Sequence, residues 1–314
     1  MTTLAPPVNH ASRSPRALSV AAILTACAIL PLVFVGAGVT STDSGMAYKD
    51  WPTSAGHLVN PPSWWQADDT RWEHGHRLLG WTVGMLAIVV AVLSWPSGGI
   101  VRTGGVCLLV AIIIQGVLGG MRVQEVSTPL AMVHGIWGQL CFCLACTIAL
   151  VTSKKWHSTE DRRSFPAAGF LQRLCLFGVV GVFLQLILGA ALRHFDSTPA
   201  LVGHLLWAVF ISLIVGWIAM WVVGQFASDH LLGLLGRVVA ILLIIQLLLG
   251  GLAFVATRLM HGPSLLATLA PSAHVLIGAL LLACMVSLTF VSYKGLSQPK
   301  TQNGPRLQNE SILA

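Results

Sequence analysis

Eight apolar stretches constrain this chain more than any other feature, since each is close to the roughly 20 residues that a helix needs to cross a bilayer. The whole chain of 314 residues is 55% hydrophobic and only 9% charged. Soluble domains do not have this composition, so we predict an all-α membrane protein with eight transmembrane helices. The stretches are residues 17–39, 73–95, 100–121, 129–152, 169–192, 199–223, 234–256 and 271–293.

The lysines and arginines predict which side of the membrane each loop occupies. Eight spans put both termini on one side, and twelve of the 18 basic residues fall on that side. Because basic residues favour cytoplasmic loops, we expect both termini in the cytoplasm. The polar segment before the first stretch makes a weak transit peptide, which favours a bacterial plasma membrane over a mitochondrial inner membrane. This placement explains the net charge of +7 without a nucleic-acid partner.

Three of the stretches end in the same way, which indicates an internal repeat. Each has a glutamine followed four residues later by a glycine, then a loop with an arginine, then a histidine in the first turns of the next stretch. The first hairpin fits more loosely, with Gly36-Ala37-Gly38, a long loop and then His76. Repeats of this kind often frame a site between them. The three sets are Gln115, Gly119 and His134; Gln185, Gly189 and His204; and Gln246, Gly250 and His274.

This repeat predicts four helical hairpins, or two pseudo-symmetric four-helix bundles. The expected order along the chain is a cytoplasmic tail, an N-terminal half, a cytoplasmic linker, a C-terminal half and a second cytoplasmic tail. Their boundaries are 1–16, 17–152, 153–168, 169–293 and 294–314.

The four histidines lie at equivalent depths on the even-numbered spans, and within each half they form a pair: His76 with His134, and His204 with His274. Two imidazoles from opposite helices are what an iron porphyrin needs as axial ligands, and bundle cores often hold such groups. A single histidine could simply hydrogen-bond a neighbouring helix. Four of them at the same place in a repeat favour metal ligation instead.

The arginines after these spans lie where haem propionates would emerge, and guanidinium groups suit carboxylates. Anchoring to lipid headgroups is the alternative for these side chains. The four candidates are Arg77, Arg122, Arg193 and Arg258.

The second span begins with the sequence Glu-His-Gly-His-Arg at residues 73–77. Ionisable groups at the mouth of a membrane helix are costly, so they indicate a functional site. Glu73 and His76 are three residues apart and share one helix face. His74 competes with His76 as the metal ligand, and spacing alone leaves the choice open.

Three segments of the chain resemble the haem A synthase family: residues 41–47 (Ser-Thr-Asp-Ser-Gly-Met-Ala), 50–53 (Asp-Trp-Pro-Thr) and 73–77. The resemblance implies an enzyme that oxidises the C8 methyl of haem O to a formyl group, giving haem A for cytochrome oxidase. It implies haem O in the N-terminal half, near Glu73, His76 and His134, and haem b in the C-terminal half, on His204 and His274. It favours His76 over His74.

The same resemblance implies haem O synthase (a farnesyltransferase) and cytochrome oxidase assembly factors as partners. Many members of the family carry a cysteine pair in the first outer loop, whereas residues 40–72 contain no cysteine. The chain therefore resembles the type that lacks this pair, and a thiol-based reducing step at this loop is in doubt. Asp43 stands where a glycine is usual.

Two other functions use the same residues. A non-catalytic dihaem b-type cytochrome, carrying electrons from quinol, would need the four histidines and no carboxylate beside them. Glu73 favours the enzyme, in which it would assist proton movement or stabilise a positively charged intermediate. A transporter built on repeats ranks last, because it predicts broken helices near mid-membrane and these stretches are continuous.

Overall fold

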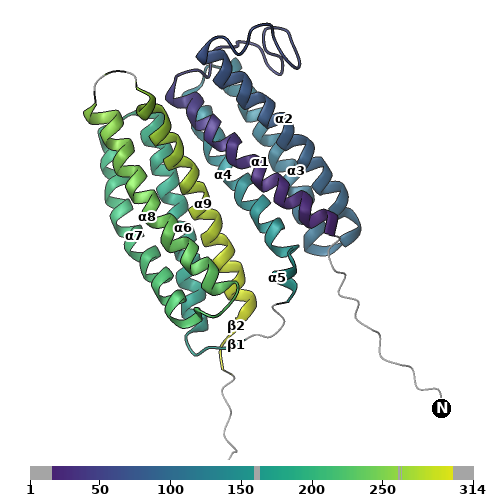
Figure 1. Cartoon of the computed structure of the whole chain (residues 1–314), viewed down its shortest axis with the longest axis vertical. Coiled ribbons are helices and arrows are strands. Elements are labelled where there is room, and N and C mark those ends of the chain that lie inside the picture. Colours follow the sequence, from purple (N-terminus) through teal and green to yellow (C-terminus); the bar gives the residue numbers. More distant parts are fainter. Residues whose placement is uncertain (1–15, 159–162, 261, 263, 300–314) are drawn as a thin grey trace, which may run out of the picture.

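The computed structural model describes residues 16–158, 163–260, 262 and 264–299. Within these residues, eight helices are long and apolar enough to cross a membrane, which confirms the predicted number. Most of the two predicted tails lies outside the described residues. The eight helices are α1 (Arg16–Ser41), α2 (Asp68–Ser94), α3 (Gly99–Gln124), α4 (Thr128–Val151), α6 (Ala168–Phe195), α7 (Thr198–Phe226), α8 (Leu232–Phe254) and α9 (Leu265–Gly295) (Figure 1).

The helices form two groups of four, which lie side by side in Figure 1. In the first group α1 contacts α2, α2 contacts α3, α3 contacts α4, and α4 returns to α1. The second group repeats this order from α6 to α9. Contacts of α1 and α4 with α9, and of α4 with α6, join the two groups. Each group is therefore a closed ring of four helices, and the pseudo-symmetry of the two groups stays a prediction.

The linker between the groups is short and ordered where it is described. It contains α5 (Lys154–His157) and β1 (Arg163–Ser164), which pairs in parallel with β2 (Leu296–Ser297) directly after α9. The main-chain N–H of Phe165 also donates to the carbonyl of Ser297 at 2.9 Å. Composition alone does not predict this two-residue pair, which gives partners to main-chain groups beyond the helix end.

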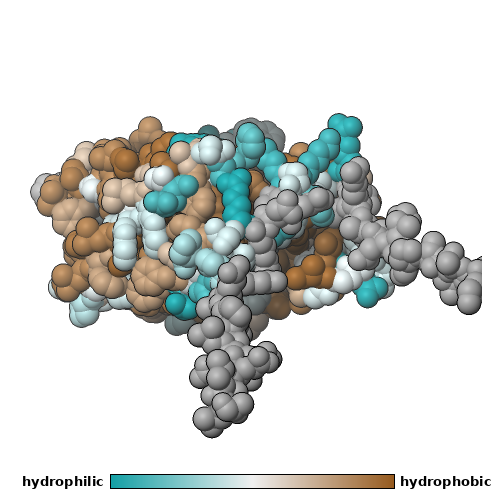
Figure 2. Space-filling model, turned by 90° about the horizontal axis from the view of Figure 1, so that it is seen from below, coloured by the Kyte–Doolittle hydropathy of each residue, from teal (hydrophilic) through white to brown (hydrophobic). Residues whose placement is uncertain are grey.

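Burial differs strongly between helices of the second group. Half of the most apolar 18-residue segment of α9 is buried inside the protein, whereas only 6% of the corresponding segment of α8 is buried. Large apolar side chains on α7 and α8 are correspondingly exposed, including Leu213 at 70% and Leu248 at 69%. Figure 2 shows apolar side chains covering much of the surface, with polar ones gathered toward the middle of the end in view. The molecule therefore has the exposed apolar surface that a lipid environment requires.

Serine caps fix where three histidine-bearing helices begin. The side chains of Ser127, Ser197 and Ser264 accept hydrogen bonds from main-chain N–H groups in the first turns of α4, α7 and α9. Such caps satisfy donors that the helix itself leaves free.

A further short 3-10 turn follows α2 at Trp95–Ser97, and a π turn follows α8 at Val255–Leu259.

Candidate functional site

Two pairs of histidine rings face each other at the end of the molecule where α2, α4, α7 and α9 begin, here called the histidine end. The ring centres of His76 on α2 and His134 on α4 are 6.2 Å apart. Those of His204 on α7 and His274 on α9 are 6.3 Å apart. The structure thus brings together the two pairs that the repeat predicts, one in each group of helices.

These separations suit one metal ion between two imidazoles. A metal–imidazole bond is about 2.0–2.1 Å long. A ring nitrogen lies about 1 Å from its ring centre, so two opposed rings sharing one metal have centres about 6 Å apart. The observed 6.2 and 6.3 Å agree with that requirement. The spacing of the ring centres in each pair is therefore compatible with one shared iron.

Each histidine ring packs against a glycine on the preceding helix. A Cβ atom placed on that glycine would lie only 2.7–3.0 Å from Cε1 of the histidine, closer than most or all real Cβ contacts. Only glycine lets the ring approach the neighbouring backbone this closely. The four contacts are Gly36 with His76, Gly119 with His134, Gly189 with His204, and Gly250 with His274.

Glutamines one turn before these glycines hold two of the rings in a ligand-ready state. Nδ1 of His134 lies 3.2 Å from the main-chain carbonyl of Gln115, and Nδ1 of His274 lies 3.2 Å from that of Gln246. A carbonyl only accepts hydrogen bonds, so Nδ1 carries the proton. Nε2 then presents its lone pair, which the side-chain amides of Gln115 and Gln246 contact at 3.2 and 3.3 Å and which a metal would take in their place.

The side-chain oxygens of the same glutamines lack partners. Oε1 of Gln115, Gln185 and Gln246 is buried and has no hydrogen bond to any described residue. A buried acceptor without a donor is costly and needs an explanation in a folded protein. The glycine contacts and the ring separations, by contrast, fit a porphyrin site beside each pair.

Glu73 and Arg77 join the first histidine pair to the long loop between α1 and α2. Oε1 of Glu73 lies 2.5 Å from Nη2 of Arg77, and both side chains are largely buried. Oε2 of Glu73 accepts a hydrogen bond from the main-chain N–H of Tyr48 at 2.9 Å. Arg77 donates further to the carbonyls of Asp50, at 2.8 Å, and of Thr53. The two side chains therefore fasten the loop over this site.

His74 turns to the loop and not to a partner histidine. Its Nδ1 lies 3.0 Å from Oγ of Ser54, and its Nε2 lies 3.3 Å from Oδ1 of Asn60. Its ring packs against Trp64, with 5.0 Å between the ring centres. The structure separates the roles that spacing left open, because His76 faces His134 and His74 supports the loop.

The other three predicted arginines are also bound to protein groups. Arg122 donates to the carbonyl of Gly45 at 2.7 Å. Arg193 donates to the carbonyl of Ala37 and, at 2.7 Å, to Oγ of Ser41, so it ties α6 to the end of α1. Arg258 forms an ion pair with Asp196. All four arginines lie at the histidine end, and their contact with propionates stays a prediction.

The segment at residues 50–53, noted above only as a family resemblance, shapes this loop. The Asp50 carboxylate accepts hydrogen bonds from the Thr53 hydroxyl and from the N–H groups of Ala55 and Gly56. The Thr53 hydrogen bond, foremost, holds the pKa of Asp50 at about 2, below its ordinary value of 3.8. The Trp51 ring lies against Gly120 of α3, where a Cβ would be 2.5 Å from the ring. The Asp-Trp-Pro motif could have identified the part of the loop between α1 and α2 that covers the first histidine pair, here called the lid.

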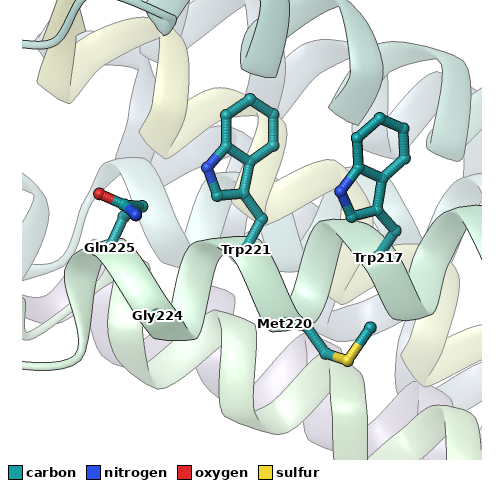
Figure 3. A pocket seen from close by; sticks show the side chains of 5 residues that line it. All are labelled: Trp217, Met220, Trp221, Gly224 and Gln225. Atoms are coloured by element: carbon teal, nitrogen blue, oxygen red, sulfur yellow. The ribbon is translucent and has the colours of Figure 1, made fainter.

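A shallow groove lies elsewhere, near the opposite end of α7. It is lined by Trp217, Met220, Trp221, Gly224 and Gln225, with the two indole rings side by side (Figure 3). The rings of Trp217 and Trp221 are nearly parallel, at 11°. His204 lies several helical turns away near the start of α7, so this groove is separate from the histidine pairs.

The family of cytochrome oxidase assembly proteins matches residues 19–205 of the chain, more than half of its length. The chain belongs to this family. The matched part runs from α1 into α7 and includes Glu73, His76, His134 and His204. His274 lies beyond it, and its inclusion in the site depends on the geometry of the second pair.

Individual relatives in the family carry the name haem A synthase. The protein from Shouchella clausii is 25% identical over 269 residues, which cover 75% of this chain and 85% of that protein. The protein from Azorhizobium caulinodans is 29% identical over 236 residues, covering 62% and 66%. The protein from Symbiobacterium thermophilum is 28% identical over 198 residues, covering 60% and 63%. The latter two matches span less than two thirds of those proteins.

Proposed function

We propose that this chain is a haem A synthase, which oxidises the C8 methyl of haem O to a formyl group. The observation that carries the proposal is the presence of two opposed imidazole pairs, 6.2 and 6.3 Å apart, in one membrane chain of this family. One pair serves the substrate and the other a resident cofactor. A simple one-haem protein would need only one of them.

In this proposal His76 and His134 hold haem O, and His204 and His274 hold haem b. Haem b, when bound, supplies one-electron redox chemistry that no side chain can perform alone. The protein orients both porphyrins through the glycines that pack against the ligand rings. The lid over the first pair, pinned by Arg77 and Arg122, limits water at the reacting methyl group.

Glu73 is the proposed catalytic group. It lies one turn before His76 on α2, and only 4% of its surface is exposed. Its negative charge would stabilise positive charge that develops at the substrate during oxidation. Both carboxylate oxygens also bind protein groups, Oε1 the Arg77 guanidinium and Oε2 the Tyr48 N–H, which hold the carboxylate in place.

The propionates of each haem would meet arginines of the histidine end. Arg77 and Arg122 flank the first pair, and Arg193 and Arg258 belong to the second half. Each guanidinium has five N–H donors. Both Nη atoms of Arg77 already donate to protein groups, so only its Nε–H remains for a propionate, whereas Arg122 donates to Gly45 through Nη2 alone.

The cellular setting follows from the proposed activity and the distribution of charge. The histidine end would face outward from a bacterial plasma membrane, with both termini cytoplasmic. Haem O synthase would supply the substrate, and assembly factors of cytochrome oxidase would receive haem A. Reporter fusions placed after residues 126 and 158 test this orientation, since the first must lie outside the cytoplasm and the second inside it.

The activity is tested by producing the chain in cells that make haem O but no haem A, then extracting the haems and weighing them. We expect haem A with the intact chain and none with a His134→Ala control. Haem b alone, without haem A or an oxidised form of haem O, would contradict the proposal and favour a non-catalytic dihaem electron carrier.

A further inference from the structure

The four histidines are not equally supported. Three of the helices that precede them carry a glutamine four residues before the packing glycine, and in α1 this position is Leu32. Leu32 precedes Gly36 by the same four residues, and Gly36 packs against His76. The first histidine is therefore the one member of the set whose helix neighbour offers no side-chain amide.

The three glutamines act as straps between helices. Nε2 of Gln115 donates to the main-chain carbonyl of His134 at 3.1 Å, and Nε2 of Gln185 donates to that of His204 at 3.1 Å. Nε2 of Gln246 lies 3.3 Å from Nε2 of His274. Each strap fixes a histidine relative to the helix that carries its packing glycine.

Two of the histidines have a second strap one turn further along. Nε1 of Trp137 donates to the carbonyl of Ala111 at 2.9 Å, beside His134. Nε1 of Trp207 donates to the carbonyl of Gly181 at 2.8 Å, beside His204. The position three residues after His76 is Leu79, which has no such donor.

The imidazole of His76 is also held less firmly at its Nδ1 atom. Its buried Nδ1 makes no hydrogen bond of standard geometry to the described residues, and the main-chain carbonyl of Leu32 gives it only a weaker interaction. In contrast, the Nδ1 atoms of His134 and His274 each lie 3.2 Å from a glutamine carbonyl. Such a hydrogen bond fixes the ring and makes it a better ligand, and its loss lowers metal affinity by about 10–100-fold.

We propose that His76 is the exchangeable axial ligand, which releases and rebinds the substrate iron while His134 keeps hold of it. Leu32 makes this exchange possible, and Gln115, Gln185 and Gln246 are positioning residues that keep the other three histidines bound. The inference rests on the proposed function, and it explains how one chain retains a haem in its C-terminal half and turns over another in its N-terminal half.

Haem transfer from the purified full-length protein tests this inference. The protein is loaded with haem b at both pairs and mixed with excess apomyoglobin, and the transfer is followed by absorbance. We expect a fast phase from the first pair and a slow phase from the second. A His134→Ala variant assigns the fast phase by abolishing it, and a His274→Ala variant assigns the slow one.

Leu32→Gln is the decisive variant, and Leu32→Met is its matched apolar control. The added amide should slow the fast phase about three- to tenfold, the effect of one net hydrogen bond. Leu32→Met should leave it unchanged. Carbon monoxide replaces a weakly held axial ligand on reduced iron. It should bind one of the two haems in the original protein, and a smaller fraction of that haem in the Leu32→Gln variant.

Gln185→Leu and Gln246→Leu test whether removing the amide loosens a haem in the second pair. These two variants decide the inference if Leu32→Gln does not fold. Each should speed the slow phase by a similar factor. Equal fast phases in the Leu32→Gln and Leu32→Met variants, or a slow phase unchanged by both glutamine replacements, would overturn the inference. Failure of the proposed function would show differently, as an absence of haem A from cells while the exchange phases remain.

Discussion

Oε1 of Glu73 lies 2.5 Å from Nη2 of Arg77, one turn further along α2. The other oxygen, Oε2, binds the main-chain N–H of Tyr48 in the long loop. The carboxylate proposed for chemistry is thus also a structural tie between the first histidine pair and its lid. Variants of this residue must be designed to separate the two roles.

Replacing Glu73 by Ala should leave both haems bound and stop haem A production, because the histidine pairs do not depend on the carboxylate. Loss of a charged catalytic group commonly lowers turnover by about 10²–10⁴-fold. Glu73→Gln keeps an acceptor for the Tyr48 N–H and loses only the charge, so it should be equally inactive while its loop resists protease as before. Haem A made at the original rate by either variant would remove Glu73 from the mechanism.

Gly250 and Gly251 offer a matched pair of substitutions. A Cβ at Gly250 would lie 3.0 Å from Cε1 of His274, whereas a Cβ at Gly251 has no atom within 4 Å. Gly250→Ala should displace the ring and reduce the haem bound by the C-terminal half, and Gly251→Ala should not. Haem content per chain, from pyridine haemochrome spectra, measures both. Equal haem in the two variants would show that this contact does not position His274.

Arg193 and Arg258 should differ in their effect on stability. The ion pair of Arg258 with Asp196 is solvent-exposed, so Arg258→Ala should cost no more than about 1 kcal/mol. Arg193→Ala removes two hydrogen bonds of a charged donor, to the carbonyl of Ala37 and to Oγ of Ser41, and with them a link between the two groups of helices. That loss should cost about 1–3 kcal/mol. Thermal unfolding in detergent compares them, and a larger loss for Arg258→Ala would contradict this order.

The turn around Asp50 should open in acid. Its pKa is lowered to about 2, so the folded turn favours the charged carboxylate. The stabilisation is complete above the ordinary value of 3.8 and is lost as the pH falls through about 2. Pepsin cleavage within residues 50–57 should therefore rise between pH 4 and pH 2.

An Asp50→Asn variant provides the control for this titration. It should be cleaved readily at pH 4 already, and its cleavage rate should change little toward pH 2. Both rates are divided by the rate of pepsin on an unrelated substrate at the same pH. Parallel pH profiles for Asp50→Asn and the original chain would show that this carboxylate does not control the turn.

The helices and the histidine pairs follow from local and repeated signals in the sequence. Apolar length gives the eight spans, and the repeated glutamine, glycine and histidine place His134, His204 and His274 at one depth. Pairing follows because helices joined in closed rings bring corresponding residues together. These inferences need no knowledge of individual side-chain contacts.

The lid and the arginines could not be predicted in the same way. Arg77 binds the carbonyls of Asp50 and Thr53, which lie more than 20 residues earlier, and main-chain acceptors leave no pattern in a sequence. The start of α2 at Asp68 was also missed, because its first turn is polar and hydropathy detects only the apolar part. The start of α9 before Pro271 was missed for a similar reason, since proline usually marks a boundary.

Electron paramagnetic resonance of the purified protein, combined with single His→Ala variants, tests the central claim most directly. We predict two low-spin haems, each with two histidine ligands. The signal of one should change in the His76→Ala and His134→Ala variants, and that of the other in the His204→Ala and His274→Ala variants. A colourless protein, or haem signals that none of the four substitutions alters, would contradict the account.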